Sequence, residues 1–235
     1  MPHQHIELEV RGEVNTREIP AIVKRLQALG FASEPVTRRT SVMSFGHVIN
    51  DKRFHATEDD HADVRCRVTN GEAEIVAKIG PPHAHNRREI AIPLAVREMI
   101  GIAQLFGAMG FSSKIGSRIG NNFTKADVCV TIAQSNSDLA YIELEIISDA
   151  EHETRDLQRL RDLGEQLGVT LWKGRQEFDE FCKRLTERDD WEFGGTDKDI
   201  KRLKDEIRET GSDRTRAANK GAQCRARCRR KEAKA

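Results

Sequence analysis

Short segments that alternate apolar and charged residues recur along this chain, and the first lies near its beginning. Leu8 and Val10 alternate there with Glu7, Glu9 and Arg11. Because successive side chains of a β-strand point to opposite faces, this segment predicts a strand with one apolar and one charged face. A row of charges is costly to bury without partners. The charged face therefore requires water, a metal ion, an anionic ligand or opposite charges.

The same alternation returns in later segments, with acidic pairs at both ends of the series and basic residues between them. A turn at Asn70-Gly71 joins two of these segments as a hairpin. Further strands are expected at 36–49, at 53–55, and after Asn121-Asn122, where Asp127 is expected on the charged face. The charged positions that define the series are Arg65 and Arg67, then Lys78, then Arg87 and Glu89, then Lys114 and Arg118, and last Glu143 and Glu145.

Helical periodicity separates the strands and indicates how their apolar faces are covered. Amphipathic helices are expected from about Asn15 to Gly30 and over about 94–109, 150–167 and 175–186. A helix followed by Gly-Phe and a basic strand occurs twice, at 30–31 and 110–111, which suggests two equivalent halves. These patterns predict an α+β protein: a β-barrel with a charged interior, covered by amphipathic helices.

Composition limits the function classes. Charged residues make up 33% of the chain but leave a net charge of only +1, which argues against nucleic-acid binding through bulk positive charge. No apolar stretch approaches the length of a membrane span, no signal segment is evident, and the 5 Cys follow no regular spacing. A cytoplasmic protein with reduced thiols is expected.

The chain is expected to divide into a main domain and a tail. Residues 1–187 form the predicted barrel domain, and residues 188–235 form a charged C-terminal tail that is partly helical or disordered. The end of the tail is basic. Contact between this tail and a nucleic acid is a weaker alternative to a solubilising role.

The ordered set of charged strand faces resembles the CYTH superfamily, the triphosphate tunnel metalloenzymes. Glu7-x-Glu9-x-Arg11 is similar to the ExExK signature of that family, and the later charged positions follow in the family's order over about residues 5–185. The resemblance implies an eight-stranded antiparallel β tunnel barrel that binds a small triphosphate or polyphosphate together with Mg²⁺ or Mn²⁺. It also implies a role for each matching residue.

By this resemblance, the acids would bind metal and the bases would hold phosphate. The implied metal ligands are Glu7, Glu9, Glu143 and Glu145. Glu9 and Arg11 are the implied catalytic residues. The implied substrate-binding residues are Arg65, Arg67, Lys78, Arg87, Lys114 and Arg118.

Three departures from the family pattern bear on catalysis. Arg11 replaces the signature Lys, and a guanidinium does not readily release a proton. Ala91 and Ala133 stand where acids are expected, and Asp127 has the wrong spacing to replace the acid missing at Ala133. The main hypothesis is a metal-dependent hydrolase of tripolyphosphate, thiamine triphosphate or a nucleoside triphosphate. The alternatives are a class IV-type adenylate cyclase and a catalytically weakened protein that only binds polyphosphate or triphosphates.

Overall fold

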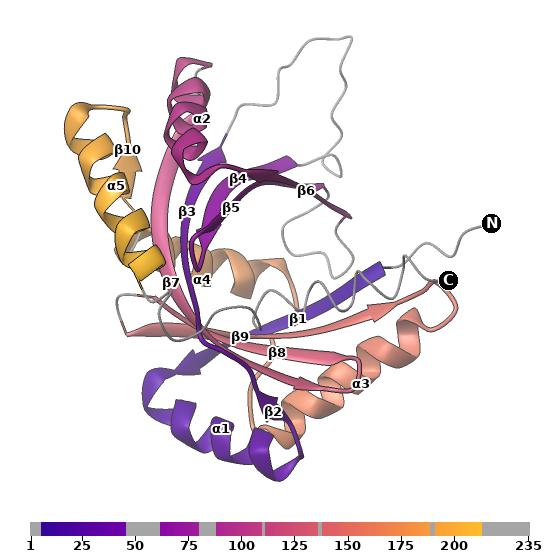
Figure 1. Ribbon diagram of the computed structural model, residues 1–235. Helices are drawn as coiled ribbons and strands as arrows, with labels where there is room; N and C mark the ends of the chain where they lie inside the picture. Colours follow the sequence, from indigo (N-terminus) through magenta and orange to yellow (C-terminus); the bar gives the residue numbers. More distant parts are fainter. Residues whose placement is uncertain are drawn as a thin grey trace. The chain divides into compact units, whose positions relative to one another are not determined.

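A computed structural model describes residues 6–45, 62–79, 88–109, 111–135, 138–188 and 191–212 (Figure 1). Arg87, the strand expected at 53–55 and the tail beyond residue 212 lie outside these ranges. The strands are β1 (Ile6–Asn15), β2 (Ala32–Ser33), β3 (Thr37–Phe45), β4 (Ala62–Thr69), β5 (Glu72–Ile79), β6 (Arg88–Leu94), β7 (Ser112–Lys125), β8 (Val128–Ser135), β9 (Leu139–Ser148) and β10 (Trp191–Phe193). The helices are the 3₁₀ turn η1 (Thr16–Glu18), α1 (Ile19–Ala28), α2 (Val96–Ala108), α3 (Glu153–Gln166), α4 (Arg175–Arg188) and α5 (Asp197–Ser212).

Eight strands form the main path of one sheet. Their order is β1-β9-β8-β7-β3-β4-β5-β6, and the short strands β2 and β10 both pair with β7. The pairs of β9 with β1 and β8 are antiparallel, as are the successive pairs from β3 to β6. The predicted α+β class with an antiparallel eight-strand sheet is confirmed.

The chain forms two compact units, which are described separately here. Within the described ranges, unit 1 contains residues 6–37 and 119–181, and unit 2 contains residues 38–118 and 182–212. The long strand β7 contributes its second half to unit 1 and its first half to unit 2. One helix–Gly-Phe segment lies in each unit, at α1 and at α2.

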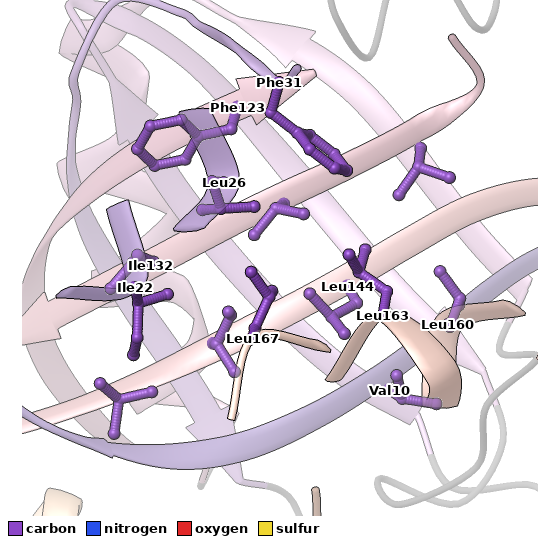
Figure 2. Close-up of a cluster of buried hydrophobic side chains, with 14 of the residues drawn as sticks. Val10, Ile22, Leu26, Phe31, Phe123, Ile132, Leu144, Leu160, Leu163 and Leu167 are labelled. Carbon is purple, nitrogen blue, oxygen red and sulfur yellow. The ribbon is translucent and has the colours of Figure 1, made fainter. Parts of the chain in front are cut away.

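The core of unit 1 lies between the apolar faces of its strands and the helices α1 and α3 (Figure 2). Leu8 is fully buried and Val10 nearly so, as the alternation of β1 predicts. Asn15 accepts a hydrogen bond from the backbone N–H of Arg17, and Gly30 ends the helical segment with a φ of 84°. The other buried side chains include Ile22 and Leu26 of α1, Ile132 of β8, Leu144 of β9, and Leu160 and Leu163 of α3.

Unit 2 has its own core, which α2 and α5 help to form. Met99 of α2 and Leu203 of α5 are both fully buried, and they belong to one cluster with Val42 and Cys66. The cluster also contains Phe193 of β10. Residues that the sequence analysis assigns to the C-terminal tail thus contribute to the core of this unit.

The predicted start of the strand after Asn121-Asn122 is wrong. The strand β7 continues through both residues to Lys125, and the turn follows at Ala126, which has a φ of 54°. The Asn122 side chain does not break the strand because its amide donates to Pro35 O at 3.1 Å and to Thr37 Oγ1 at 3.3 Å. Asp127 consequently lies in the turn. Among the helices that the structure describes, none combines the length and apolar character of a membrane span.

Candidate functional site

Three of the predicted metal ligands converge on the charged face of unit 1. In the antiparallel pair of β1 and β9, Glu9 lies opposite Glu145, and Arg11 lies opposite Glu143. Directly opposite residues point to the same side of a sheet, so all four side chains share one face. One carboxylate oxygen each of Glu9, Glu143 and Glu145 lies within 4.8 Å of the others. Carboxylate oxygens at this spacing are suitable ligands for a hard divalent cation.

The structure does not bring Glu7 into this group. Glu7 is half-buried on β1 and lies opposite Ile147, two residues along the strands from the pair of Glu9 and Glu145. Among the residues that the structure describes, the group consists of Glu9, Glu143 and Glu145. A role for Glu7 in metal binding stays a prediction.

Arg11 lies among the same carboxylates. Its Nε donates to Glu9 Oε1 at 2.8 Å and to Glu143 Oε1 at 3.3 Å, and its Nη2 donates to Glu9 Oε2. The side chains of these three residues are each only 11–15% exposed. Burial by itself would lower the pKa of Arg11, but the charges of Glu9 and Glu143 outweigh it and raise the pKa above its ordinary value.

Glu143 shows the electrostatic consequence of this crowding. Burial and the nearby Glu9 charge together raise its pKa to about 7, against the opposing effect of the Arg11 charge. A carboxyl with such a pKa is only partly ionised near neutral pH. Additional positive charge at this position would favour its ionised form.

Aromatic side chains from the segment around α4 lie against this part of the charged face. The Arg11 guanidinium carbon lies 5.5 Å from the ring centre of Phe178, and Phe178 packs edge-on against Trp172 with ring centres 5.6 Å apart. The Trp172 ring also lies 5.0 Å from that of Phe181, which contacts Tyr141 of β9. The backbone N–H of Trp172 donates to Arg11 O at 2.8 Å, which anchors this segment on β1.

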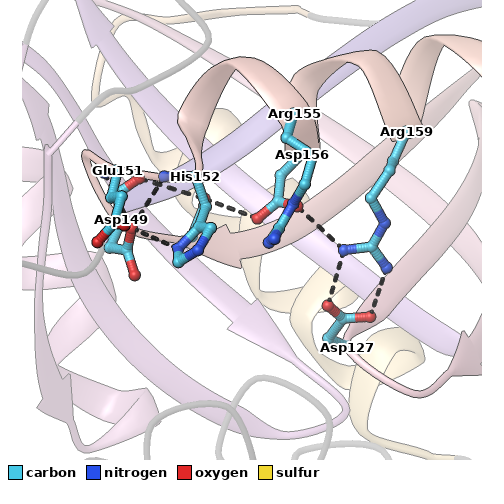
Figure 3. Close-up of polar contacts among 8 residues, drawn as sticks. Asp127, Asp149, Glu151, His152, Arg155, Asp156 and Arg159 are labelled. Carbon is cyan, nitrogen blue, oxygen red and sulfur yellow. Dashed lines mark hydrogen bonds and ion pairs between the residues drawn. The ribbon is translucent and has the colours of Figure 1, made fainter.

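Asp127 is not available to complete the acid set on this face. It lies in the turn between β7 and β8, where both of its carboxylate oxygens accept from Arg159 of α3, at 3.0 and 3.1 Å (Figure 3). Ala133, where an acid was expected, lies opposite Tyr141. Within the described part of the chain, the structure supplies no replacement for that acid in the carboxylate group.

Two of the predicted phosphate-binding residues of unit 2, Arg67 and Lys78, form an ion-pair network with acids on β5 and β6. Arg67 donates to Glu74 Oε1 at 2.7 Å and to Glu89 Oε1 at 3.1 Å, and Lys78 Nζ lies 3.4 Å from Glu89 Oε2. The Arg67 and Glu89 side chains are only 5% and 8% exposed. The two cations are thus held by acids of the same face, which accounts for their burial.

The remaining predicted bases occupy two strands of unit 2. Arg65 lies two positions before Arg67 on β4, so both side chains point to the same side. On β7, Lys114 Nζ lies 3.5 Å from a carboxylate oxygen of the exposed Glu192, and Arg118 donates to Ser117 O. Arg87 lies outside the described residues, and its role stays an expectation.

Sequence reasoning missed Arg39 as a member of this basic face. Arg39 lies opposite Thr69, and Ser41 lies opposite Arg67, so the Arg39 side chain shares a face with Arg67. Its Nε donates to Thr69 Oγ1 at 3.0 Å. The sequence did contain a signal for this placement. Arg39, Ser41 and Met43 are every second residue of β3, and a strand places such residues on one side.

Solved structures share this fold over most of their length. The PH1819 protein from Pyrococcus horikoshii is 17% identical with a TM-score of 0.57, and the match covers 76% of this chain and 99% of that one. A candidate adenylate cyclase from Vibrio parahaemolyticus is 14% identical with a TM-score of 0.58, over 76% of this chain and 98% of that one. The chain shares the fold of these solved structures.

The PH1012 protein from Pyrococcus horikoshii extends this likeness, at 17% identity and a TM-score of 0.55 over 70% of this chain and 92% of that one. No family model and no curated protein matches the sequence. Similarity at these identities concerns the fold alone.

Proposed function

We propose that this chain is a metal-dependent enzyme that hydrolyses a triphosphate-containing compound such as tripolyphosphate, thiamine triphosphate or a nucleoside triphosphate. The observation that carries the proposal is the group formed by Glu9, Glu143 and Glu145, whose carboxylate oxygens lie within 4.8 Å of one another. Three partly buried oxygen donors on a rigid sheet suit Mg²⁺ or Mn²⁺. The raised pKa of Glu143 supports this assignment, because the single positive charge of Arg11 does not balance the three acids.

The proposed role of each residue follows from the chemistry of its side chain. Glu9, Glu143 and Glu145 would hold the metal, which when bound neutralises phosphate charge and activates water as a nucleophile. Arg65, Lys114 and Arg118 would bind phosphate oxygens through their N–H donors. Arg67 and Lys78 would join them by exchanging contacts with Glu89 for contacts with phosphate.

A class IV-type adenylate cyclase is the second candidate function. The observation that favours it is the fold shared with the candidate adenylate cyclase from Vibrio parahaemolyticus. The same carboxylates and bases would serve that reaction, in which the ribose 3′-hydroxyl attacks and pyrophosphate leaves. The two reactions therefore differ in the nucleophile and in the products.

A protein that binds triphosphates without turnover is the third candidate. It is favoured by the contacts that Arg11 makes with Glu9 and Glu143, since these two acids are also proposed metal ligands. In that case binding of tripolyphosphate would be measurable but no product would form.

The decisive experiment compares products and binding in the same preparations. Tripolyphosphate, thiamine triphosphate and ATP are each incubated with Mg²⁺ or Mn²⁺, and phosphate release and cyclic AMP are measured. We expect phosphate release that Glu9→Gln and Glu143→Gln each reduce by at least about 100-fold, because each removes a charged ligand of the metal. The matched control is Glu165→Gln, an exposed acid of α3 in the same unit, which should retain full activity.

The outcomes separate the three candidates. Cyclic AMP formed from ATP, without phosphate release from tripolyphosphate, would replace the hydrolase by the cyclase. Binding of tripolyphosphate by calorimetry without either product would establish the binder. The metal-site proposal fails if Mn²⁺ binding is the same in the Glu9→Gln and Glu143→Gln variants as in the unmodified chain.

A further inference from the structure

We propose that the Arg11 guanidinium and a divalent cation compete for the carboxylates of Glu9 and Glu143, so that Arg11 sets how tightly the site binds metal. The inference rests on the metal site of the proposed function and adds a regulator within the chain. It assigns Arg11 a positioning role at the acids, in addition to the catalytic role that the resemblance implies.

The hydrogen bonds of Arg11 coincide with two of the three proposed ligands. Its forked guanidinium donates to both carboxylate oxygens of Glu9, and the Nε atom also reaches Glu143 Oε1 at 3.3 Å. Such fork geometry is the strongest arrangement that a single arginine makes with a carboxylate. A cation bound to the same group would need oxygens from the residues that Arg11 already contacts.

The burial of these side chains means that the guanidinium and a metal ion would compete for the carboxylates and would not share them. The side chains of Arg11, Glu9 and Glu143 are 14%, 11% and 15% exposed, so water screens their charges only weakly. A divalent cation and a guanidinium at the same carboxylates would repel each other at short range. Release of the guanidinium from Glu9 removes this repulsion and frees the carboxylate oxygens for the metal.

The aromatic contacts of Arg11 link its position to Trp172. The guanidinium packs over Phe178, and Phe178 packs edge-on against Trp172. The hydrogen bond from Trp172 N to Arg11 O holds the backbones of the two segments together. Movement of the Arg11 side chain would therefore change the surroundings of the Phe178 and Trp172 rings. The chain has 2 Trp, and the other, Trp191, belongs to unit 2, where it stacks with Arg202.

The first test measures Mg²⁺ and Mn²⁺ binding by calorimetry in the full chain and in three variants. Arg11→Ala removes the competitor and should tighten binding at least about tenfold. Arg11→Lys keeps the charge without the forked hydrogen bonds, so its metal affinity should lie between those of the unmodified chain and Arg11→Ala. Arg17→Ala, which removes an exposed arginine of the same unit, should bind as the unmodified chain does. Circular dichroism checks that each variant is folded. If Arg11→Ala does not fold, Arg11→Gln replaces it in the binding measurement.

The second test separates displacement from a general effect of charge. In a Trp191→Phe background, Mg²⁺ should shift the emission of Trp172, whereas adding Arg11→Ala should abolish the shift although the metal still binds. If the background variant does not fold, Trp172→Phe in the otherwise unmodified chain should lose the response instead. A response that persists in full with Arg11→Ala contradicts the displacement.

The results distinguish this inference from the proposed function. If metal binds but Arg11→Ala binds no more tightly than the unmodified chain, the competition is refuted and the metal site stands. If neither the unmodified chain nor any variant binds Mg²⁺ or Mn²⁺, the metal site itself is refuted and the competition with it. If Mg²⁺ or Mn²⁺ binds to Arg11→Ala but not to the unmodified chain, both the metal site and the competition are supported.

Discussion

Asp156 of α3 shows how hydrogen bonds keep a buried carboxylate ionised. Its side chain is only 5% exposed and accepts from Ser148 Oγ at 2.8 Å, from Arg155 Nε at 3.0 Å and from Arg159 Nη1 at 3.1 Å (Figure 3). Burial alone would raise the pKa of Asp156, but these three donors outweigh it and lower the pKa to about 2. Because Ser148 ends β9, the carboxylate also joins α3 to the strand that carries Glu143 and Glu145.

This residue predicts a specific loss of stability in acid. The pKa of Asp156 is depressed in the folded state, so its stabilising contribution is complete above about pH 4 and is lost as the pH falls toward 2. We expect Asp156→Asn to lower the free energy of unfolding by about 2 kcal/mol at pH 7 and by much less at pH 2. Urea denaturation across this range measures the difference.

The control for this prediction is Asp162→Asn, which alters an exposed aspartate of the same helix. It should leave the pH dependence of stability close to that of the unmodified chain. A variant Asp156→Asn that is destabilised equally at pH 7 and pH 2 would contradict the assignment, because the loss would then come from packing and not from the charge.

The segment between α3 and α4 is positioned by a close approach to β1. A Cβ atom added at Gly12 would lie 2.3 Å from Thr170 O and 3.1 Å from Thr170 C, both of which are backbone atoms. Glycine at this position therefore lets the segment that carries Trp172 lie directly against the strand that carries Glu9 and Arg11. The sequence shows Gly12 but not the backbone it faces.

We expect Gly12→Ala to destabilise the protein by about 1–3 kcal/mol, because a backbone atom cannot move aside as a flexible side chain can. The change should also shift the emission of Trp172. Gly107→Ala on α2 is the matched control, since nothing lies within 4 Å of its added Cβ. That substitution should stabilise the helix by up to about 1 kcal/mol, as alanine does in place of glycine. Urea denaturation of both variants provides the comparison, and equal effects would exclude the close approach as the cause.

The described residues of the molecule form two cores, and the second depends on β10 and α5. Leu203 of α5 is fully buried with Val42, Cys66 and Met99. Thr210 of the same helix hydrogen-bonds Thr40 of β3 at 2.7 Å between their hydroxyl oxygens. The strand β10 and the helix α5 are therefore parts of unit 2, although their composition is highly charged.

Leu203→Ala should lower the free energy of unfolding by about 2–5 kcal/mol, the usual cost of truncating a fully buried leucine. Lys204→Ala, at an exposed position of the same helix, should change it by less than about 0.5 kcal/mol. Thermal and urea denaturation measure both. Should Leu203→Ala prove as mild as its neighbour, α5 would not contribute to the stability of unit 2.

Local patterns in the sequence were sufficient for the elements and for their faces. The alternation of β1, β4, β5 and β9 correctly predicted strands, and Asn70-Gly71 correctly predicted a tight turn, with φ of 50° and 84°. The helices α1 to α4 were predicted from their apolar periodicity, whereas β10 and α5 fall in the segment predicted as a charged tail. These features are predictable because the direction of a side chain depends on the backbone of its own segment.

The sequence by itself determined that Glu9, Arg11, Glu143 and Glu145 lie on charged strand faces, because a period of two is a local property. Only the tertiary structure decided which of them meet. The register of β1 against β9 groups Glu9 with Glu145 and Arg11 with Glu143, and leaves Glu7 opposite Ile147. It likewise took the three-dimensional arrangement to pair Arg67 with Glu74 and Glu89, and to place Phe178 over Arg11. Register and long-range packing depend on contacts between segments far apart in the chain, which no single segment encodes.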